Sequence, residues 1–357
     1  MIAKTIRIIY NDDHSSYEND IYDGREILLD NVGATAVEIE SALAKSGFKT
    51  VVTPLKMRGD TSLDDFIREI SKSKDALIFN LCEAAFGKSR LEMHVAALLE
   101  LYGFNYTGSG PLTLGLALDK GLTKDILSSR DIMTPQYCIL SASPKKLRRN
   151  MNFPLIVKPL REDASIGIDS GAVVHTMKEF RKRVEFIIDK FKQPAIAEEY
   201  VDGREFNVAV IGNNRDARAL PPAELTFVDF PPGVPKICSY EAKWVSASPL
   251  YEKTVPVCPA EVLPELEAEL KDTALRAYDI MGCRDYARVD MRLGEDGNLK
   301  VLEVNPNPDI SGDAGLARAA LAAGMDYQRF ISVIVNIASE RHAASPARAK
   351  AKACSPA

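Results

Sequence analysis

Residues 288–305 carry the strongest structural signal in the chain, because polar and apolar side chains alternate on both sides of the polar, glycine-bearing segment 294–298. This is the pattern of a β-hairpin. Alternate residues of a strand share one face of a sheet. If the polar faces of the two strands coincide, a guanidinium, two carboxylates and an amide meet at one place: Arg288, Asp290, Glu303 and Asn305.

Such a group of oxygen donors suits Mg²⁺ or Mn²⁺, which proteins hold with few carboxylates and which substrate phosphates complete. The alternative is a polar sheet face that meets only solvent, the usual meaning of an isolated alternating hairpin. The sequence of the second strand favours the metal site over the solvated face. Aliphatic residues surround Glu303, and Pro306 and Pro308 stop the strand. A carboxylate in so apolar a run needs a partner, so we predict a metal site.

The 357-residue chain has a globular composition, with 46% hydrophobic and 27% charged residues, and its length suits two or three domains. The net charge of −5 gives no general nucleic-acid footprint. The six cysteines lack the spacing of a zinc site or a disulfide framework, which favours a reducing compartment. Neither a signal peptide nor a membrane-spanning run is visible. We expect a cytoplasmic protein that binds neither nucleic acid nor membranes.

Strand and helix signals alternate in the first third of the chain, which predicts a parallel α/β domain over residues 1–119. The expected strands are 2–10, 50–53 and 76–80, and the expected helices are 32–45, 63–71 and 92–102.

Two further units are expected at 120–205 and 206–339, followed by a tail. The former would contain strands 153–159 and 195–201 and helices from Pro144 and over 177–191; the latter would contain a helix over 261–281, the hairpin and a closing helix over 314–339. In residues 340–357, Ala, Lys, Arg and Pro dominate without periodicity, so this tail is expected to be disordered.

Lys158 ends an apolar strand and precedes a polar loop, 161–168, that contains Ser165 and Gly167. Backbone amides in such a loop, together with an ammonium group, are what a polyphosphate needs. The loop lacks the P-loop pattern. Taken alone it favours the alternative, an ordinary hairpin with a solvated lysine.

Residues 198–201 lie between strand-like stretches and could offer backbone groups to an adenine edge, while Glu205 could reach a ribose hydroxyl. A solvated turn is the alternative there. Further on, Lys243 lies beside Trp244 after a proline-rich stretch, 221–235. The alternative for this lysine is a surface position with its stem packed on Trp244.

Taken together and in order, these segments resemble the ATP-grasp superfamily, and within it the D-alanine–D-alanine ligases most closely. The resemblance spans residues 76 to about 330 and rests on the segments 79–81, 106–110, 119–120, 157–159, 161–162, 165–167, 198–206, 240–243 and 288–305. It implies an ATP-grasp fold, which is α/β with an α+β ATP-binding part, behind an N-terminal parallel α/β domain.

The resemblance also implies roles for individual residues. ATP phosphates would meet Lys120, Lys158, Ser165 and Lys243. The adenine-binding hinge would be Glu198, Glu199, Tyr200 and Val201, with Glu205 as the ribose acid. Two Mg²⁺ or Mn²⁺ ions would be held by Asp290, Glu303 and Asn305. Catalysis would involve Arg288, Lys243 and Ser165, with Arg288 steadying the oxyanion.

Enzymes of this kind phosphorylate a carboxylate to an acyl phosphate, which an amine then attacks, so that ADP and phosphate are released. Metal ions neutralise the charge of the transferred phosphoryl group, and Arg288 would donate to the developing oxyanion. The resemblance implies small amino-acid or peptide substrates. A homodimer is one open option for the assembly.

The substrate-facing segments depart from the family. Segment 9–18 does not fit the family's Gly-Gly-x-Ser-x-Glu-His-Glu opening, Glu83 stands in place of a histidine, and segment 306–315 replaces Pro-Gly-Met-Thr-x-x-Ser. Candidate substrate residues are therefore Glu83, Ser311 and Asp313. The added acids favour a basic or amine-bearing substrate over D-alanine in both sites. Alternatively, Glu83 caps a helix that begins near Ser89.

The predicted function is thus an ATP-dependent carboxylate–amine ligase similar to the D-alanine–D-alanine ligases. One alternative is a ligase that tailors a specialised peptide or another small amide. The other is a non-catalytic ATP-binding protein. The presence of Arg288 argues against the latter, because a protein that only binds nucleotide has no use for an oxyanion arginine.

Overall fold

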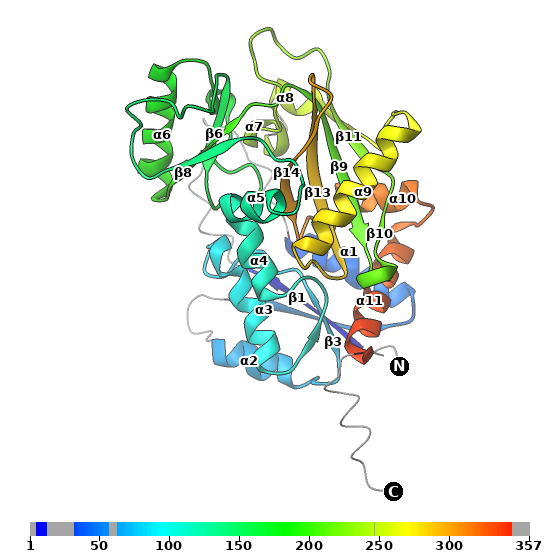
Figure 1. Ribbon diagram of the computed structural model, residues 1–357. Helices are drawn as coiled ribbons and strands as arrows, with labels where there is room; N and C mark the ends of the chain where they lie inside the picture. Colours follow the sequence, from blue (N-terminus) through cyan, green and yellow to red (C-terminus); the bar gives the residue numbers. More distant parts are fainter. Residues whose placement is uncertain (1–4, 13–31, 57–62, 246, 345–357) are drawn as a thin grey trace, which may run out of the picture.

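The computed structural model describes residues 5–12, 32–56, 63–245 and 247–344. Its strands form three sheets within these residues. The N-terminal sheet lies at the bottom of Figure 1, the second sheet at the upper left and the third at the upper right.

The first sheet is parallel and has the strand order β2-β1-β3-β4. Its strands are β1 (Thr5–Asn11), β2 (Lys49–Leu55), β3 (Leu77–Asn80) and β4 (Asn105–Tyr106), and its helices are α1 (Val32–Lys45), α2 (Leu63–Ser71) and α3 (Glu92–Leu101). Apolar residues at helical spacing on α1, among them Ile39 and Leu43, share one core with Ile6 and Ile8 of β1. The predicted parallel α/β domain is confirmed.

The second sheet is antiparallel and has the order β5-β8-β6-β7. Its strands are β5 (Tyr137–Leu140), β6 (Leu155–Pro159), β7 (Val173–Val174) and β8 (Ala195–Glu199), covered by α6 (Met177–Phe191). The helix expected from Pro144 is wrong, since residues 141–152 form bends and turns. Segment 144–150 has a single apolar side chain, Leu147, so a helix there would have no apolar face to bury.

The third sheet has the order β12-β11-β9-β13-β14, with β10 beside β9, and all its neighbours are antiparallel. Its strands are β9 (Gly203–Ile211), β10 (Arg218–Ala219), β11 (Ala223–Phe227), β12 (Thr254–Val257), β13 (Tyr286–Gly294) and β14 (Leu299–Asn305). Helix α9 (Pro264–Ile280) packs on it, and its buried Ala274 and Ala277 share a core with Val208 and Val289. Strand β9 runs across the expected boundary at residue 205.

Two helices stand where one was expected over 314–339, so that prediction is wrong. They are α10 (Gly315–Ala322) and α11 (Tyr327–Ala344). Gly324 between them has a φ of 82°, a left-handed conformation that ends a helix. Helix α11 extends to Ala344, so residues 340–344 of the expected tail are helical, and 345–357 lie outside the described residues.

Helix α11 completes the core of the N-terminal unit, although almost the whole chain separates it from β1. Its buried Ile331, Ile334 and Val335 belong to the same core as Ile39 and Leu43 of α1. Figure 1 shows α11 beside β3 and below α10. The first and last parts of the chain therefore fold together.

The remaining helices are short. They are α4 (Pro111–Leu118) and α5 (Lys120–Ser128), which lead from the first sheet to the second, and α7 (Tyr240–Trp244) and α8 (Pro249–Glu252), which follow the proline-rich stretch. Among the helices of the described residues, none is both long and apolar enough to cross a membrane.

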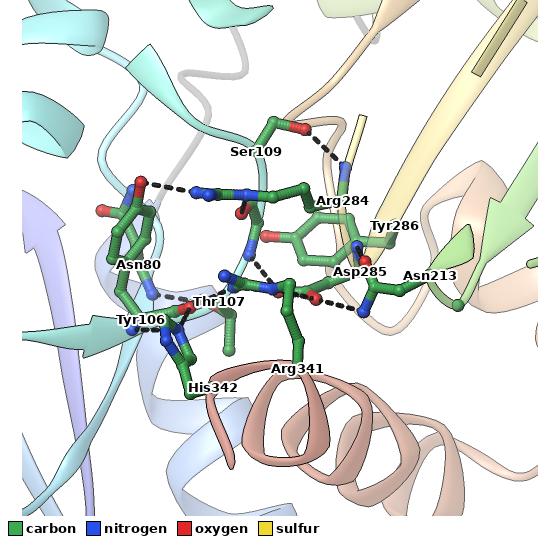
Figure 2. A network of polar contacts seen from close by, with 12 residues as sticks. Asn80, Tyr106, Thr107, Ser109, Asn213, Arg284, Asp285, Tyr286, Arg341 and His342 are labelled. Carbon is green, nitrogen blue, oxygen red and sulfur yellow. Dashed lines mark hydrogen bonds and ion pairs between the residues drawn. The ribbon is translucent and has the colours of Figure 1, made fainter. Parts of the chain in front are cut away.

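A buried polar network joins the N-terminal unit to β13 (Figure 2). The Asp285 carboxylate, which is fully buried, accepts hydrogen bonds from Arg341 at 2.8 and 2.8 Å, from Asn213 at 2.9 Å and from the backbone nitrogen of Gly108 at 2.9 Å. Arg341 also donates to the carbonyl of Tyr106 at 2.7 Å. This network fixes the start of β13 against β4 and α11, three residues before Arg288.

Candidate active site

The hairpin brings its polar residues together as the alternation predicts. In the β13–β14 register, Arg288 faces Asn305 and Asp290 faces Glu303, and the register shifts directly after Asp290. Such a bulge re-aims side chains locally. Arg288 donates two hydrogen bonds to Asp290, from Nε at 2.7 Å and from Nη2 at 2.8 Å. Asn207 of β9 donates a third, at 2.7 Å.

The two acids of the hairpin differ in their electrostatic surroundings. Burial raises the pKa of Asp290, although Arg288 opposes the shift. Burial alone would also raise the pKa of Glu303, but Lys120, Lys158 and Arg288 outweigh it and bring the pKa to about 2. Asn305 donates to Asp290 at 3.0 Å and to Glu303 at 3.3 Å, so the three predicted metal ligands are in mutual contact.

These three side chains fit a hard divalent cation, because carboxylate and amide oxygens are the ligands that Mg²⁺ and Mn²⁺ take. The part of the chain that the structure describes has no group of three or more His, Cys, Asp or Glu residues placed to hold a metal. The hairpin supplies two carboxylates and one amide. It would therefore hold an ion only together with phosphate oxygens or water.

Lys120 connects the hairpin to the polar loop 161–168. It is the first residue of α5, whose N-cap Asp119 accepts hydrogen bonds from backbone nitrogens of the first turn at 3.1 Å and from Arg161 at 2.7 Å. The buried Lys120 ammonium donates to the Glu162 carbonyl and lies 3.4 Å from Asp163 and 3.9 Å from Glu303.

Lys158 is buried, so the solvated lysine of the alternative is wrong, although β6 and β7 do pair as antiparallel strands. Its ammonium lies 3.2 Å from one oxygen of Glu198, and the ammonium of Lys124 lies 3.4 Å from the other. Burial alone would raise the pKa of Glu198, but Lys124 and Lys158 outweigh it and lower the pKa. Lys124 also donates to the Leu302 carbonyl at 3.2 Å, next to Glu303.

Sequence reasoning missed Lys124, which is fully buried and whose pKa burial lowers to about 8. A signal was present. Lys124 follows Lys120 by one turn of α5, and residues four apart share a face of a helix. Because Lys120 was already a candidate, its neighbour on the same face was a candidate too.

The loop around Ser165 is held by the segment that carries Lys243. Ser165 donates to the Cys238 carbonyl at 2.8 Å, and the Trp244 indole donates to the Ala164 carbonyl at 2.9 Å. Ala164 and Ser165 have left-handed φ angles of 53° and 62°. The Lys243 ammonium lies 4.6 Å from the Trp244 ring centroid, a cation–π contact at the edge of this loop.

The proposed hinge lies at the end of β8. Glu199 pairs with Lys300 at 3.2 Å, and the backbone nitrogen of Tyr200 donates to the Pro154 carbonyl at 3.1 Å. The Val201 carbonyl accepts from Arg292 at 2.8 Å. Arg292 also donates to Glu205 at 3.0 and 2.7 Å. The sequence analysis missed Arg292. Its position two residues after Asp290, on the same strand face, was visible in the sequence, but its contacts with Val201 and Glu205 were not.

The three candidate substrate residues do not all line one hollow. Glu83 lines a hollow whose other lining residues are Val32, Thr35, Leu81, Asn307, Pro308, Asp309 and Ile310. Its backbone nitrogen donates to Asn11 at 3.0 Å. The short helix Ser89–Leu91 has Lys88 as its N-cap and no side-chain cap, so Glu83 is not that cap.

Ser311 and Asp313 do not line this hollow. Ser311 donates to the exposed Asp313 carboxylate at 3.0 Å, and Arg318 donates to the carbonyl of Asp313 rather than to its carboxylate. A further acid, Glu92, accepts a hydrogen bond at 2.9 Å from Asn307, which lines the hollow. Burial raises the pKa of Glu92 to about 8.

A sequence model of the family described as "D-ala D-ala ligase C-terminus" matches residues 128–336, more than half of the chain. The chain belongs to this family. It is 32% identical over 311 residues to the uncharacterized protein y4sG of Sinorhizobium fredii, covering 87% of this chain and 89% of that protein. It is 32% identical over 273 residues to the D-alanine--D-alanine ligase of Cupriavidus pinatubonensis, covering 73% and 79%.

The fold agrees with this membership in the D-alanine–D-alanine ligase family. The structure of the Bacillus anthracis D-alanine--D-alanine ligase complexed with ATP covers 96% of this chain and 99% of its own, with a TM-score of 0.71 and 22% identity. The predicted ATP-grasp fold and the membership among ATP-grasp ligases are both confirmed.

Proposed function

We propose that this member of the family joins a carboxylate to an amine through an acyl phosphate, with ADP and phosphate as products. The observation that carries the proposal is the convergence of Arg288, Asp290, Glu303 and Lys120 on one face of the hairpin. A protein that only bound ATP would have no need for a guanidinium fixed beside the acids.

The reaction balances with the groups that this family uses. A substrate carboxylate oxygen attacks the γ-phosphorus and ADP leaves. The amine nitrogen then attacks the acyl carbon, phosphate leaves, and the nitrogen loses a proton. Mg²⁺ held by Asp290, Glu303 and Asn305 would neutralise phosphate charge. Arg288, whose pKa its partner Asp290 raises despite burial, stays cationic and would donate to the oxyanion.

The lysines supply the remaining positive charge. Lys120 and Lys158 come from different elements, α5 and β6, and both lie close enough to Glu303 to lower its pKa. Glu198 holds Lys158 in place at 3.2 Å. We propose that these two lysines meet the polyphosphate, that loop 161–168 with Ser165 covers it, and that Lys243 approaches from α7.

The substrate side supports an amine-bearing substrate rather than D-alanine in both positions. Glu83 and Asp309 line the same hollow next to the hairpin. Carboxylates there would favour a cationic group and disfavour a second carboxylate. Because Asp313 lies outside the lining, this proposal rests on Glu83 and Asp309. A ligase that tailors a small peptide or amide is compatible with it.

The decisive experiment is amine-dependent ADP release from the purified chain with Mg²⁺ and ATP, across a panel of D- and L-amino acids and diamino acids, with mass detection of the product. We expect an amide product and a stoichiometric release of ADP. ATP binding without ADP release for any pair in the panel would favour the non-catalytic alternative.

We also propose that the enzyme works in the cytoplasm, where ATP is supplied. Among the described residues, Cys138, Cys238, Cys258 and Cys283 form no disulfide, which is what a reducing compartment favours. A homodimer stays a prediction, which the molar mass in solution will decide.

A further inference from the structure

Arg292 is a buried arginine that contacts the end of the proposed nucleotide hinge, at Val201. It is 3% exposed on β13. Its cross-strand neighbour on β9 is Glu205. The guanidinium lies 5.5 Å from the ring of Tyr200 and 5.8 Å from the ring of Phe227. A buried guanidinium must have its donors satisfied, and here its partners all belong to the proposed nucleotide site or border on it.

The hydrogen bonds of Arg292 fix three separate pieces of chain. Nη1 donates to the Val201 carbonyl at 2.8 Å, and Nη2 donates to the Lys236 carbonyl. Nε at 3.0 Å and Nη2 at 2.7 Å both donate to Glu205. One planar group therefore holds the end of the hinge, the residue that follows the proline-rich stretch and the proposed ribose acid in one arrangement.

The two bonds to Glu205 end on the same oxygen. Both Nε and Nη2 reach Oε2, which leaves Oε1 as the oxygen that this pair does not occupy. A carboxylate accepts hydrogen bonds through both of its oxygens. Two donors on Oε2 restrict rotation of the carboxylate, so a hydroxyl that binds Glu205 would have to approach Oε1.

We propose that Arg292 is a positioning residue for the ribose of ATP: it orients Glu205 so that Oε1 accepts a hydrogen bond from a ribose hydroxyl. The inference rests on the proposed use of ATP at this site. It predicts that the protein distinguishes ATP from deoxy-ATP, and that this distinction depends on Arg292 although Arg292 itself does not touch the ribose.

The readout is the ratio of affinities for ATP and for 2′-deoxy- or 3′-deoxy-ATP, measured by calorimetry with Mg²⁺ and without substrate. One hydrogen bond to a charged acceptor corresponds to a ratio of roughly tenfold or more for at least one hydroxyl. A change that only loosened the fold would weaken all three nucleotides alike and leave the ratios unchanged.

The decisive variant is Arg292→Lys, which keeps the buried charge but cannot donate from a rigid fork. Of the two affinity ratios, ATP over 2′-deoxy-ATP and ATP over 3′-deoxy-ATP, we expect the larger to fall at least threefold in Arg292→Lys. In Arg292→Met the same ratio should approach one. The matched control is Arg204→Met. Arg204 lies next to Glu205 in the chain but pairs with Glu224 at 2.8 and 2.6 Å, and it should keep the wild-type ratio.

A double-mutant cycle separates action through Glu205 from direct action. Glu205→Gln should lower the ratio by itself, and adding Arg292→Lys should lower it no further. The inference is overturned if Arg292→Lys retains the wild-type ratio or if the double variant loses more than Glu205→Gln does. A wild-type protein that binds ATP with the expected ratios but forms no amide would contradict the proposed function alone.

Discussion

Arg341, close to the end of α11, donates two hydrogen bonds of 2.8 Å to the fully buried carboxylate of Asp285, at the entrance to β13. The last helix thus neutralises a charge beside the strand that carries Arg288 and Asp290. Through Tyr106, whose carbonyl accepts from Arg341 at 2.7 Å, the same side chain reaches the N-terminal sheet. The position of the hairpin relative to the N-terminal unit depends on this pair.

We expect Arg341→Ala to lower the free energy of unfolding by about 3–5 kcal/mol, because removing one partner of a buried ion pair leaves an uncompensated charge. Asn213 and Gly108 still donate to Asp285, so the lower end of this range is expected. Guanidinium denaturation followed by circular dichroism measures it. The control is Arg329→Ala on the exposed face of the same helix, which should change stability by less than about 0.5 kcal/mol.

Asp290→Asn and Glu303→Gln should each abolish turnover and the dependence of nucleotide binding on Mg²⁺. Their carboxylates would bind the divalent ion that neutralises the charge of the polyphosphate. Steady-state ADP release and calorimetry with and without Mg²⁺ test this. Asp296→Asn, in the loop of the same hairpin and exposed, is the matched control and should retain activity. Undiminished turnover in either hairpin variant would exclude the metal assignment.

Lys158→Ala should weaken ATP binding by about 1.5–3 kcal/mol, the contribution of one charge-assisted contact. It should also lower stability, since Glu198 would keep only Lys124 as its partner at 3.4 Å. Calorimetric titration with ATP is the measurement, with thermal unfolding as the check on folding. Lys182→Ala, an exposed lysine of α6, serves as the control. An unchanged ATP affinity in Lys158→Ala would remove Lys158 from the nucleotide site.

Glu92 gives the protein a stability that depends on pH. Burial raises its pKa from 4.5 to about 8, so between these values the folded protein keeps a proton that the unfolded chain releases. The stabilisation is complete below about pH 4.5 and is lost as the pH rises through 8. In Glu92→Gln the free energy of unfolding should fall less steeply with rising pH, and at pH 8.5 it should be roughly 1–3 kcal/mol higher than in wild type.

Denaturation curves at pH 5.5, 7 and 8.5 compare this variant with wild type, and Glu185→Gln on the exposed face of α6 is the control. The amide of the Glu92 variant can still accept from Asn307. A wild-type slope in Glu92→Gln would mean that another group causes the decline.

Much of the geometry of the candidate site could be predicted from sequence because its signals are local. Lys158 ends a strand, Lys120 starts a helix, and the alternation of residues 288–305 fixes which side chains share a face. Lys124 also had a local signal, its position one turn after Lys120 on α5, whereas Arg292 could not be found because its role arises from pairing across the chain. Arg292 and Glu205 are separated by 87 residues and meet only because β13 pairs with β9.

The errors in the fold have similar causes. The break between α10 and α11 depends on the left-handed Gly324, which sequence alone presents as one glycine in an alanine-rich run. The extension of α11 to Ala344 is stabilised by contacts of Arg341 with Asp285 and Tyr106. The composition of that segment favoured disorder, and tertiary contacts outweighed it.

Glu83→Gln tests the proposed substrate class. In wild type we expect kcat/KM for a diamino acid to exceed that for D-alanine, because Glu83 and Asp309 line one hollow and would attract a side-chain ammonium. In the variant, the ratio of kcat/KM for the diamino acid to that for D-alanine should fall roughly tenfold, which corresponds to about 1.4 kcal/mol. The part of this preference that Asp309 contributes should remain. Glu38→Gln, an exposed acid of α1 that accepts from Gly312 at 3.1 Å and does not line the hollow, removes the same charge nearby and should leave the preference intact. If D-alanine paired with itself is the best substrate in wild type and Glu83→Gln changes nothing, the hollow does not select for an amine.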